Sequence, residues 1–250
     1  MVDYVIGDEY VLPSHGKFYD VPVNDHVKLR SMTTNEEMRR LNVSENQYKP
    51  MADIIDECLI DKPGISSYDM CLGDYQFLMY KLRITTYGAD YPLECRCPYC
   101  LSTFEEHVNL EDLPVREFDK SILEHKEFDL PRTKHHIKIR LQTPRILDTI
   151  ARQENEEKKR RKSSTASSEI IQLSNIVEEI DGERPDPFFA EDFYRNLPMM
   201  DTKVILRHEE RLSNEVGLGT DLTVTCPVCN NSYNSSFRVT SEFFDPSLDI

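Results

Sequence analysis

The chain has 250 residues, of which 39% are hydrophobic and 30% charged, a composition typical of a globular protein and not of a disordered one. Its net charge of −15 argues against nucleic acid as a partner, because phosphate-binding domains carry an excess of Lys and Arg. No apolar run approaches the roughly 20 residues of a membrane span, and the N-terminus lacks the basic and apolar stretches of a secretory signal. We therefore expect a protein of the reducing cytosol that has no contact with a membrane.

The first half of the chain predicts a strand, three helices and a hairpin. Residues 27–30 alternate apolar and polar side chains as a strand does, and residues 34–37 (Thr-Asn-Glu-Glu) form a capping-box pattern that begins a helix. Apolar residues then recur at helical spacing over 51–59 and again over 74–84. The segment 93–100, Leu-Glu-Cys-Arg-Cys-Pro-Tyr-Cys, predicts a β-hairpin that carries a pair of cysteines.

The second half repeats the same order of signals. Leu12-Pro13-Ser14 has a counterpart in Leu130-Pro131-Arg132. The counterparts that follow are a strand at 137–140, a helix beginning at Thr143-Pro144, a helix carrying Ile170, Leu173, Ile176, Val177 and Ile180, a helix over 201–212, and a cysteine hairpin over 222–229. Several matches in one order indicate a duplication. We therefore predict an α+β protein of two similar units, residues 1–115 and 116–250.

The second unit carries a charged, Ser-rich insertion at about 154–168. This segment has no apolar residue apart from Ala166, so its burial would bring little stabilisation. Its basic run, Lys158 to Lys162, is also compatible with a nucleic-acid or localisation patch. We favour a solvated helix extension that continues into a flexible loop.

Four of the seven cysteines form two Cys-Pro-x-Cys pairs, Cys97 with Cys100 and Cys226 with Cys229. Two thiolates separated by two residues chelate one metal, and two such pairs complete a closed tetrahedral site, which is structural and not catalytic. An odd number of cysteines without a signal peptide also argues against a disulfide framework. We predict one structural zinc ion per chain, shared by the two hairpins.

The strongest alternative is redox chemistry, because Cys97-Pro98-Tyr99-Cys100 taken alone is the active-site tetrapeptide of glutaredoxins. In that fold a helix follows the first cysteine, whereas residues 101–108 here are typical of a returning strand. A second pair of cysteines has no place in a glutaredoxin. Cys95 and His107 are spare ligand candidates, but Val224 and Ser236 stand at the matching places in the second unit. We find no motif of a catalytic site and predict that the protein is not an enzyme.

The sequence resembles the T4-type bacteriophage baseplate hub and hub-assembly proteins. The resemblance spans nearly the whole chain and rests on residues 12–37, on residues 74–100 and on the closing pair at 226–229. It implies a structural or assembly role in a contractile tail, with no catalytic residues. Relatives often have glycine after each pair, where this chain has Leu101 and Asn230, and asparagine tolerates a left-handed backbone better than leucine.

We therefore expect a non-enzymatic component of the hub region of a phage tail baseplate, with zinc holding its two halves. Its partners would be other baseplate or hub proteins, with no membrane, nucleic acid or small-molecule substrate. It would act in the host cytoplasm during assembly, with the tail baseplate of the virion as the alternative place. A glutaredoxin-like redox protein, a zinc-ribbon nucleic-acid binder and an adaptor unrelated to phage tails remain the alternative functions.

Overall fold

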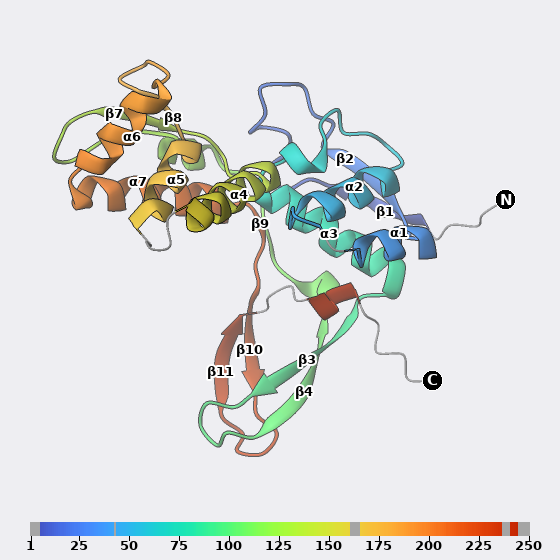
Figure 1. Ribbon diagram of the computed structural model, residues 1–250. Helices are drawn as coiled ribbons and strands as arrows, with labels where there is room; N and C mark the ends of the chain where they lie inside the picture. The colour runs from blue at the N-terminus through green and yellow to red at the C-terminus, as the bar shows by residue number, and fades with distance from the viewer. Residues whose placement is uncertain (1–5, 43, 161–165, 237–240, 245–250) are drawn as a thin grey trace.

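The computed structural model describes residues 6–42, 44–160, 166–236 and 241–244. Helices and strands are mixed, and the strands of these residues form four two-stranded sheets and one three-stranded sheet. Figure 1 shows two mainly helical lobes side by side and a stalk of two hairpins that projects from them. The predicted α+β class is confirmed.

The first lobe is formed by the N-terminal part of the chain. Its first helix begins at Thr34, as predicted. The N-cap is the preceding residue, Thr33, whose backbone N–H donates to the Glu36 carboxylate over 2.7 Å. The elements of this lobe are β1 (Ile6–Val11), β2 (His26–Arg30), α1 (Thr34–Arg40), α2 (Lys49–Cys58), a short 3₁₀ turn (Ser67–Asp69) and α3 (Leu72–Tyr87).

The second lobe contains the three-stranded sheet β6-β7-β8 and four helices. Thr143 precedes its first helix, as predicted, and its hydroxyl accepts the backbone N–H of Ile146 over 3.3 Å. The elements are a 3₁₀ turn (Lys120–His125), β6 (Glu127–Asp129), β7 (His136–Ile139), α4 (Pro144–Arg160), α5 (Ala166–Ile176), β8 (Val177–Ile180), α6 (Pro187–Asn196) and α7 (Met199–Asn214).

One predicted helix is wrong over its last four residues. Val177 and Ile180 belong to strand β8, in which Val177 pairs with Ile139 and Ile180 with Ile137 of β7. Both side chains are buried, so the apolar spacing is real but does not distinguish the end of a helix from a short buried strand. β-branched residues favour the strand, where they pack well on a pleated surface.

The predicted insertion continues a helix. Residues 154–160 form the last turns of α4, which agrees with a helix extension. Asn175 of α5 donates to Gln153 over 2.7 Å, so α4 and α5 lie against each other just before this extension. Residues 161–165, which include the start of the predicted Ser-rich loop, lie outside the residues that the structure describes.

Each lobe has its own apolar core, and a few side chains cross between them. Phe243, from the 3₁₀ turn Ser241–Phe244 near the end of the chain, packs in the first core with its ring centroid 4.8 Å from that of Tyr80. In the other direction, Phe18 and Cys71 from the first lobe pack in the second core. The lobes therefore bury apolar surface against each other.

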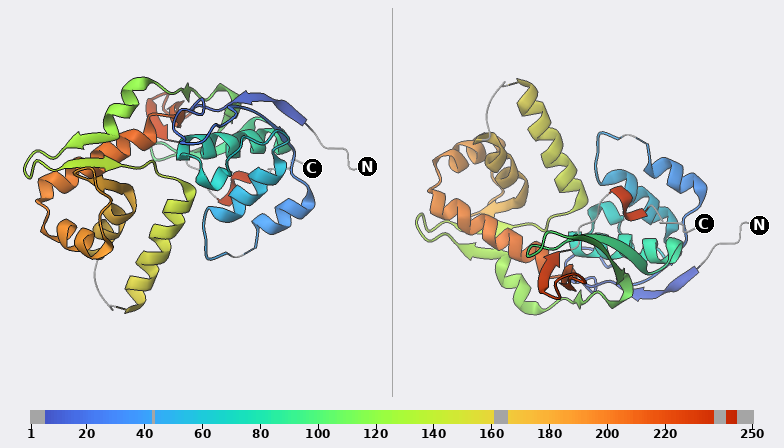
Figure 2. Two further views of the ribbon diagram at one scale, coloured as in Figure 1. Left: turned by 90° about the horizontal axis from the view of Figure 1, so that it is seen from above. Right: turned by 90° about the horizontal axis from the view of Figure 1, so that it is seen from below.

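The N-terminus of α2 is capped from the other lobe. The buried carboxylate of Asp148 in α4 accepts the backbone N–H groups of Gln47, Tyr48 and Lys49, over 2.7 to 3.2 Å, and the Tyr68 hydroxyl over 3.0 Å. These are donors that a helix leaves without a partner at its N-terminus, and a negative charge there is stabilising. Figure 2 shows α4 reaching outward beside the first lobe.

The chain enters and leaves the second lobe through two paired strands, β5 (Val115–Arg116) and β9 (Gly217–Leu218). β9 lies directly against the start of α3. A Cβ atom on Gly73 would sit 2.3 Å from the carbonyl oxygen of Val216, so this approach requires glycine. The backbones of the two lobes are thus in contact at the base of the stalk.

The stalk consists of two antiparallel hairpins. β3 (Asp90–Arg96) pairs with β4 (Thr103–Asn109), and β10 (Asp221–Thr225) pairs with β11 (Ser232–Ser236). Their turns lie together at the tip, at the end far from the lobes (Figure 1). Among the helices of the described residues, none is both long enough and apolar enough to span a membrane.

Candidate metal centre

The two cysteine turns have the same backbone hydrogen bonds. In the first turn the N–H of Leu101 donates to the carbonyl of Cys97 over 3.0 Å, and in the second the N–H of Asn230 donates to that of Cys226 over 2.9 Å. The first cysteine of each pair also donates its backbone N–H across the turn. Cys97 donates to the carbonyl of Ser102 over 2.9 Å, and Cys226 donates to the carbonyl of Asn231 over 3.0 Å. The strand-turn-strand geometry therefore presents both thiols of each pair toward one side.

Both turns close through a residue with a left-handed backbone. Leu101 has φ of 63° and Asn230 has φ of 57°. Asparagine adopts this conformation at little cost, whereas leucine does so at a cost of roughly 1 kcal/mol. The first turn therefore has leucine at a left-handed position that leucine disfavours. The Leu101 side chain is exposed to solvent.

The four predicted ligands come together. Cys97 Sγ lies 3.6 Å from Cys229 Sγ and Cys100 Sγ lies 3.6 Å from Cys226 Sγ, and all four sulfurs lie within 4.8 Å of one another. A tetrahedral zinc site with metal–sulfur bonds of about 2.3 Å has sulfur–sulfur edges of about 3.8 Å. The close contacts join one hairpin to the other, so the donor set and its dimensions fit one metal ion bound by both.

Neighbouring groups favour the thiolate form at two of these cysteines. The Ser102 hydroxyl, 3.3 Å from Cys226 Sγ, is the main cause that lowers the pKa of Cys226 to about 6, and backbone N–H groups of the turn assist it. Ser102 also lowers the pKa of Cys100 from 3.0 Å. At Cys229 the backbone N–H of Asn231 tends to lower the pKa of the thiol. Burial and the neighbouring thiols outweigh this effect and raise the pKa to about 11. The metal-free cluster thus retains a proton that a metal must displace.

Nearly the whole chain matches a known protein family. A family model described as "T4 bacteriophage base plate protein" matches residues 9–245. The chain belongs to this family. None of the curated proteins and none of the solved structures matches it significantly. Membership implies a structural role in the tail baseplate of a phage, in a family that is generally non-enzymatic.

The spare ligand candidates of this baseplate protein lie outside the cluster. Cys95 is buried on β3, and burial raises the pKa of its thiol. His107 is exposed near the far end of β4, where its ring nitrogen lies 2.9 Å from the carboxylate of Asp90. Cys58 and Cys71 are buried in the lobes. Of the seven cysteines, the structure brings together the four that the sequence selected.

The turns of this baseplate protein do not have the geometry of a glutaredoxin site. Cys97 and Cys100 lie between β3 and β4, so a strand follows the pair where a redox fold has a helix. The dipole of a helix N-terminus, which lowers the pKa of a redox thiol, is therefore not available to Cys97.

Sequence reasoning missed Ser102 and Asn231. Each stands two residues after the second cysteine of its pair, and each contacts a sulfur, since the Asn231 amide donates to Cys229 Sγ over 3.5 Å. Small polar residues at the same position of both turns were a visible signal. Together they contact the sulfurs of Cys100, Cys226 and Cys229, and hydrogen-bond donors in such positions stabilise ligand thiolates.

Proposed function

We propose that the protein is a non-enzymatic structural or assembly component of the hub region of a contractile tail baseplate. In this proposal one zinc ion, bound by Cys97, Cys100, Cys226 and Cys229, holds its two halves together. The observation that carries it is the meeting of two sequence-distant hairpins at four sulfurs, in a chain of the baseplate family. A site with four protein ligands has no open position for a substrate, so its role is structural.

We also propose that the two halves, residues 1–115 and 116–250, are copies of one ancestral unit, the second of which gained the charged insertion at about 154–168. Corresponding strands support this. β1 pairs with β2 and β6 with β7, each followed by two helices. The chain then returns to the second strand in both halves, through the bridge Leu29↔Leu59 in one and the pair Ile139↔Val177 in the other.

Two buried aspartates support the duplication further. Asp74 and Asp201 are each the third residue of a 16-residue helix, α3 and α7. Asp74 accepts the backbone N–H of Ser14 over 2.9 Å, and Asp201 accepts those of Arg132 and Thr133 over 3.0 and 2.9 Å. Both carboxylates thus bind the turn that follows a Leu-Pro pair. These two Leu-Pro pairs, at 12–13 and 130–131, are the first motifs that match between the halves of the sequence.

The hairpins match in register as well. Cys95 pairs with Phe104 in the first, and Val224 pairs with Tyr233 in the second. In both hairpins the first residue of this pair lies two positions before the first ligand, and the second lies four positions after the last. In our proposal the zinc fixes the relative orientation of these two hairpins, and neighbouring baseplate subunits recognise the surface that both halves form.

The test combines metal content with assembly. Purified protein is expected to contain about one zinc per chain, and phage carrying Cys226→Ser and Cys229→Ser is expected to accumulate tails without a complete baseplate, because two ligands hold zinc weakly. Cys58→Ala, which removes a buried thiol from a lobe, is the matched control and should assemble normally.

Two results would contradict the proposal. Normal contractile tails from the double serine variant would show that zinc is dispensable for assembly. Metal-free protein in which Cys97 and Cys100 cycle as a disulfide with a dithiol reductant would favour the redox alternative. Whether the protein acts only in the host cytoplasm or stays in the virion tail follows from its presence in purified particles.

A further inference from the structure

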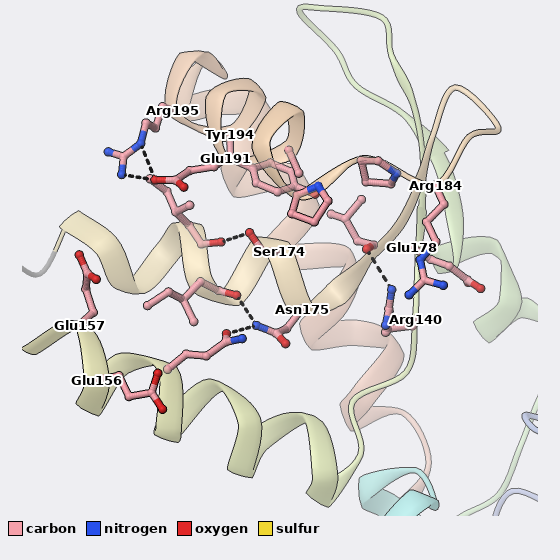
Figure 3. Close-up of a pocket in the computed structure, with 17 residues that line it drawn as sticks. Arg140, Glu156, Glu157, Ser174, Asn175, Glu178, Arg184, Glu191, Tyr194 and Arg195 are labelled. Atoms are coloured by element: carbon pink, nitrogen blue, oxygen red, sulfur yellow. Dashed lines mark hydrogen bonds and ion pairs between the residues drawn. The ribbon is translucent and has the colours of Figure 1, made fainter.

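The second lobe contains a pocket of about 730 Å³ that the metal centre does not involve. Its walls come from α4, α5, β8 and α6, from the segment that joins β8 to α6, and from Arg140, which directly follows β7 (Figure 3). This volume lies in the range of pockets that bind a ligand or a short segment of chain. The pocket combines apolar side chains with seven charged ones, and the ion pairs among these determine which ligand it can bind.

Three arginines and four glutamates line the pocket, and some of them neutralise each other. Arg195 pairs with Glu191 over 2.6 Å within α6, and Glu178 lies 3.7 Å from Lys138, which is outside the pocket. Arg184 is exposed and has neither an ion pair nor a hydrogen bond with any described residue. Arg140 has one weak side-chain contact, 3.4 Å from the Val177 carbonyl. Figure 3 shows Arg140 and Arg184 together at one end of the pocket, where Glu178 also lies.

Two buried polar atoms at the pocket wall also lack a partner. The hydroxyl of Tyr194, whose side chain is 4% exposed, and Nε of Arg140 have no hydrogen bond, and they are two of four such side-chain atoms in the described residues. Each uncompensated group of this kind costs about 1–3 kcal/mol. Burial raises the pKa of Tyr194, and the charge of Arg140 opposes this. Such groups in a native structure commonly indicate a bound ligand or ordered water.

The other end of the pocket is acidic. Glu156 and Glu157 of α4 line it, away from Arg140 and Arg184 (Figure 3). The complete lining therefore has four carboxylates against three guanidinium groups, which disfavours a phosphate with its higher negative charge. A guanidinium group binds a single carboxylate well. A ligand with a carboxylate at one end, a positive charge at the other and apolar groups between them complements the pocket.

We propose that this pocket binds a polypeptide segment of another baseplate subunit, whose carboxylate (an acidic side chain or the free carboxyl group at the end of that subunit) contacts Arg140 and Arg184. A basic residue of the same segment contacts Glu156. The choice of a polypeptide rests on the proposed baseplate function, since a baseplate component works through contacts with other proteins. The pocket is then a second contact site, separate from the metal-bound stalk.

The test uses the full zinc-loaded protein and an array of short overlapping peptides that cover the other tail proteins of the same genome. We expect it to bind peptides that contain a carboxylate and a basic residue. Arg184→Glu should weaken this binding by about ten-fold or more, the equivalent of one lost charge contact. Arg207→Glu is the matched control, because Arg207 is exposed on α7, outside the pocket lining. Replacing the acidic residue of a bound peptide by lysine should restore binding to Arg184→Glu.

Several outcomes would overturn the proposal. These are an array with no bound peptide, equal binding by Arg184→Glu and Arg207→Glu, or pocket-dependent binding of inorganic phosphate or free glutamate in place of any peptide. The last would identify a small-anion site. None of them affects the zinc proposal, whose failure appears as normal tails from the double serine variant. The two proposals therefore fail in distinguishable ways.

Discussion

The two lobes and the stalk are stabilised by different interactions. In the lobes, residues such as Leu29, Ile55 and Ile137 are completely buried in apolar cores. Near the tip of the stalk, the buried side chains of the described residues are two ligands, Cys97 and Cys226, with Cys95 and Val224 beneath them. Isolated two-stranded hairpins are marginally stable in water. The lobes are therefore held by hydrophobic burial, whereas the tip has little buried apolar surface apart from the four cysteines of the proposed zinc site.

The largest expected effect follows from removing half of the ligands. In the variant with Cys226→Ser and Cys229→Ser, the tip should lose protection from amide hydrogen exchange while α3 and α7 keep it, because structural zinc contributes roughly 10 kcal/mol of binding free energy. Exchange measured by mass spectrometry distinguishes the two regions. Loss of protection throughout both lobes would show that the lobes depend on the metal as well.

The next effect belongs to the first lobe. Burial tends to raise the pKa of the Glu36 carboxyl. Hydrogen bonds from Arg30 and Thr33 outweigh this effect and lower the pKa to about 2. The resulting stability is fully present above the unfolded pKa of about 4.5 and is lost as the pH falls toward 2. Glu36→Gln should therefore lower the free energy of unfolding at pH 7 by about 3 kcal/mol, and the deficit should shrink in acid.

Urea unfolding monitored over a pH series measures this deficit. Glu57→Gln is the control, since Glu57 forms an exposed pair with Arg39 and such pairs contribute less than about 1 kcal/mol. An equal loss in both variants, independent of pH, would contradict the role of the buried ion pair.

The stalk should respond to pH in a different way. With the metal removed, the pKa of Cys229 is about 11 and that of Cys226 about 6, so zinc displaces at least the Cys229 proton below pH 11 and the Cys226 proton as well below pH 6. The apparent affinity for zinc should rise about ten-fold, or 1.4 kcal/mol, with each unit of increasing pH for every proton that zinc displaces. Below pH 6, where more protons are displaced, the affinity should fall more steeply as the pH decreases. Competition with a chromophoric chelator measures it. An affinity that is constant with pH would exclude proton displacement.

The smallest effect distinguishes the two turns. Leu101→Gly removes a side chain from a left-handed backbone and should strengthen the metal-bound stalk by about 1 kcal/mol, which chelator competition would detect. Asn230→Gly is the matched change in the other turn, and we expect only a few tenths of a kcal/mol there. If both glycine variants behave alike, the cost assigned to Leu101 is absent.

The sequence predicted most of this architecture because its signals are local. Cys-Pro-x-Cys pairs flanked by alternating residues determine both hairpins, and helical spacing determined α3 and α7. The prediction of a helix failed at Val177, where the spacing of three between apolar residues fits both a helix and a short buried strand. Nothing in the sequence indicated that Asp148 caps α2 or that Phe243 packs in the first core, because these contacts join residues far apart in the sequence.

The position of the proposed metal site would also change the topology of the polypeptide. Cys100 and Cys226 are 126 positions apart, and the whole second lobe lies between them. A bound zinc would therefore close this lobe into a ring, and in the chain-entropy model a cross-link over such a loop destabilises the unfolded state by about 5 kcal/mol. A single cut inside the ring would leave both pieces joined through the metal. To separate them would then require a chelator that opens the ring together with a denaturant that unfolds the apolar core of the lobe.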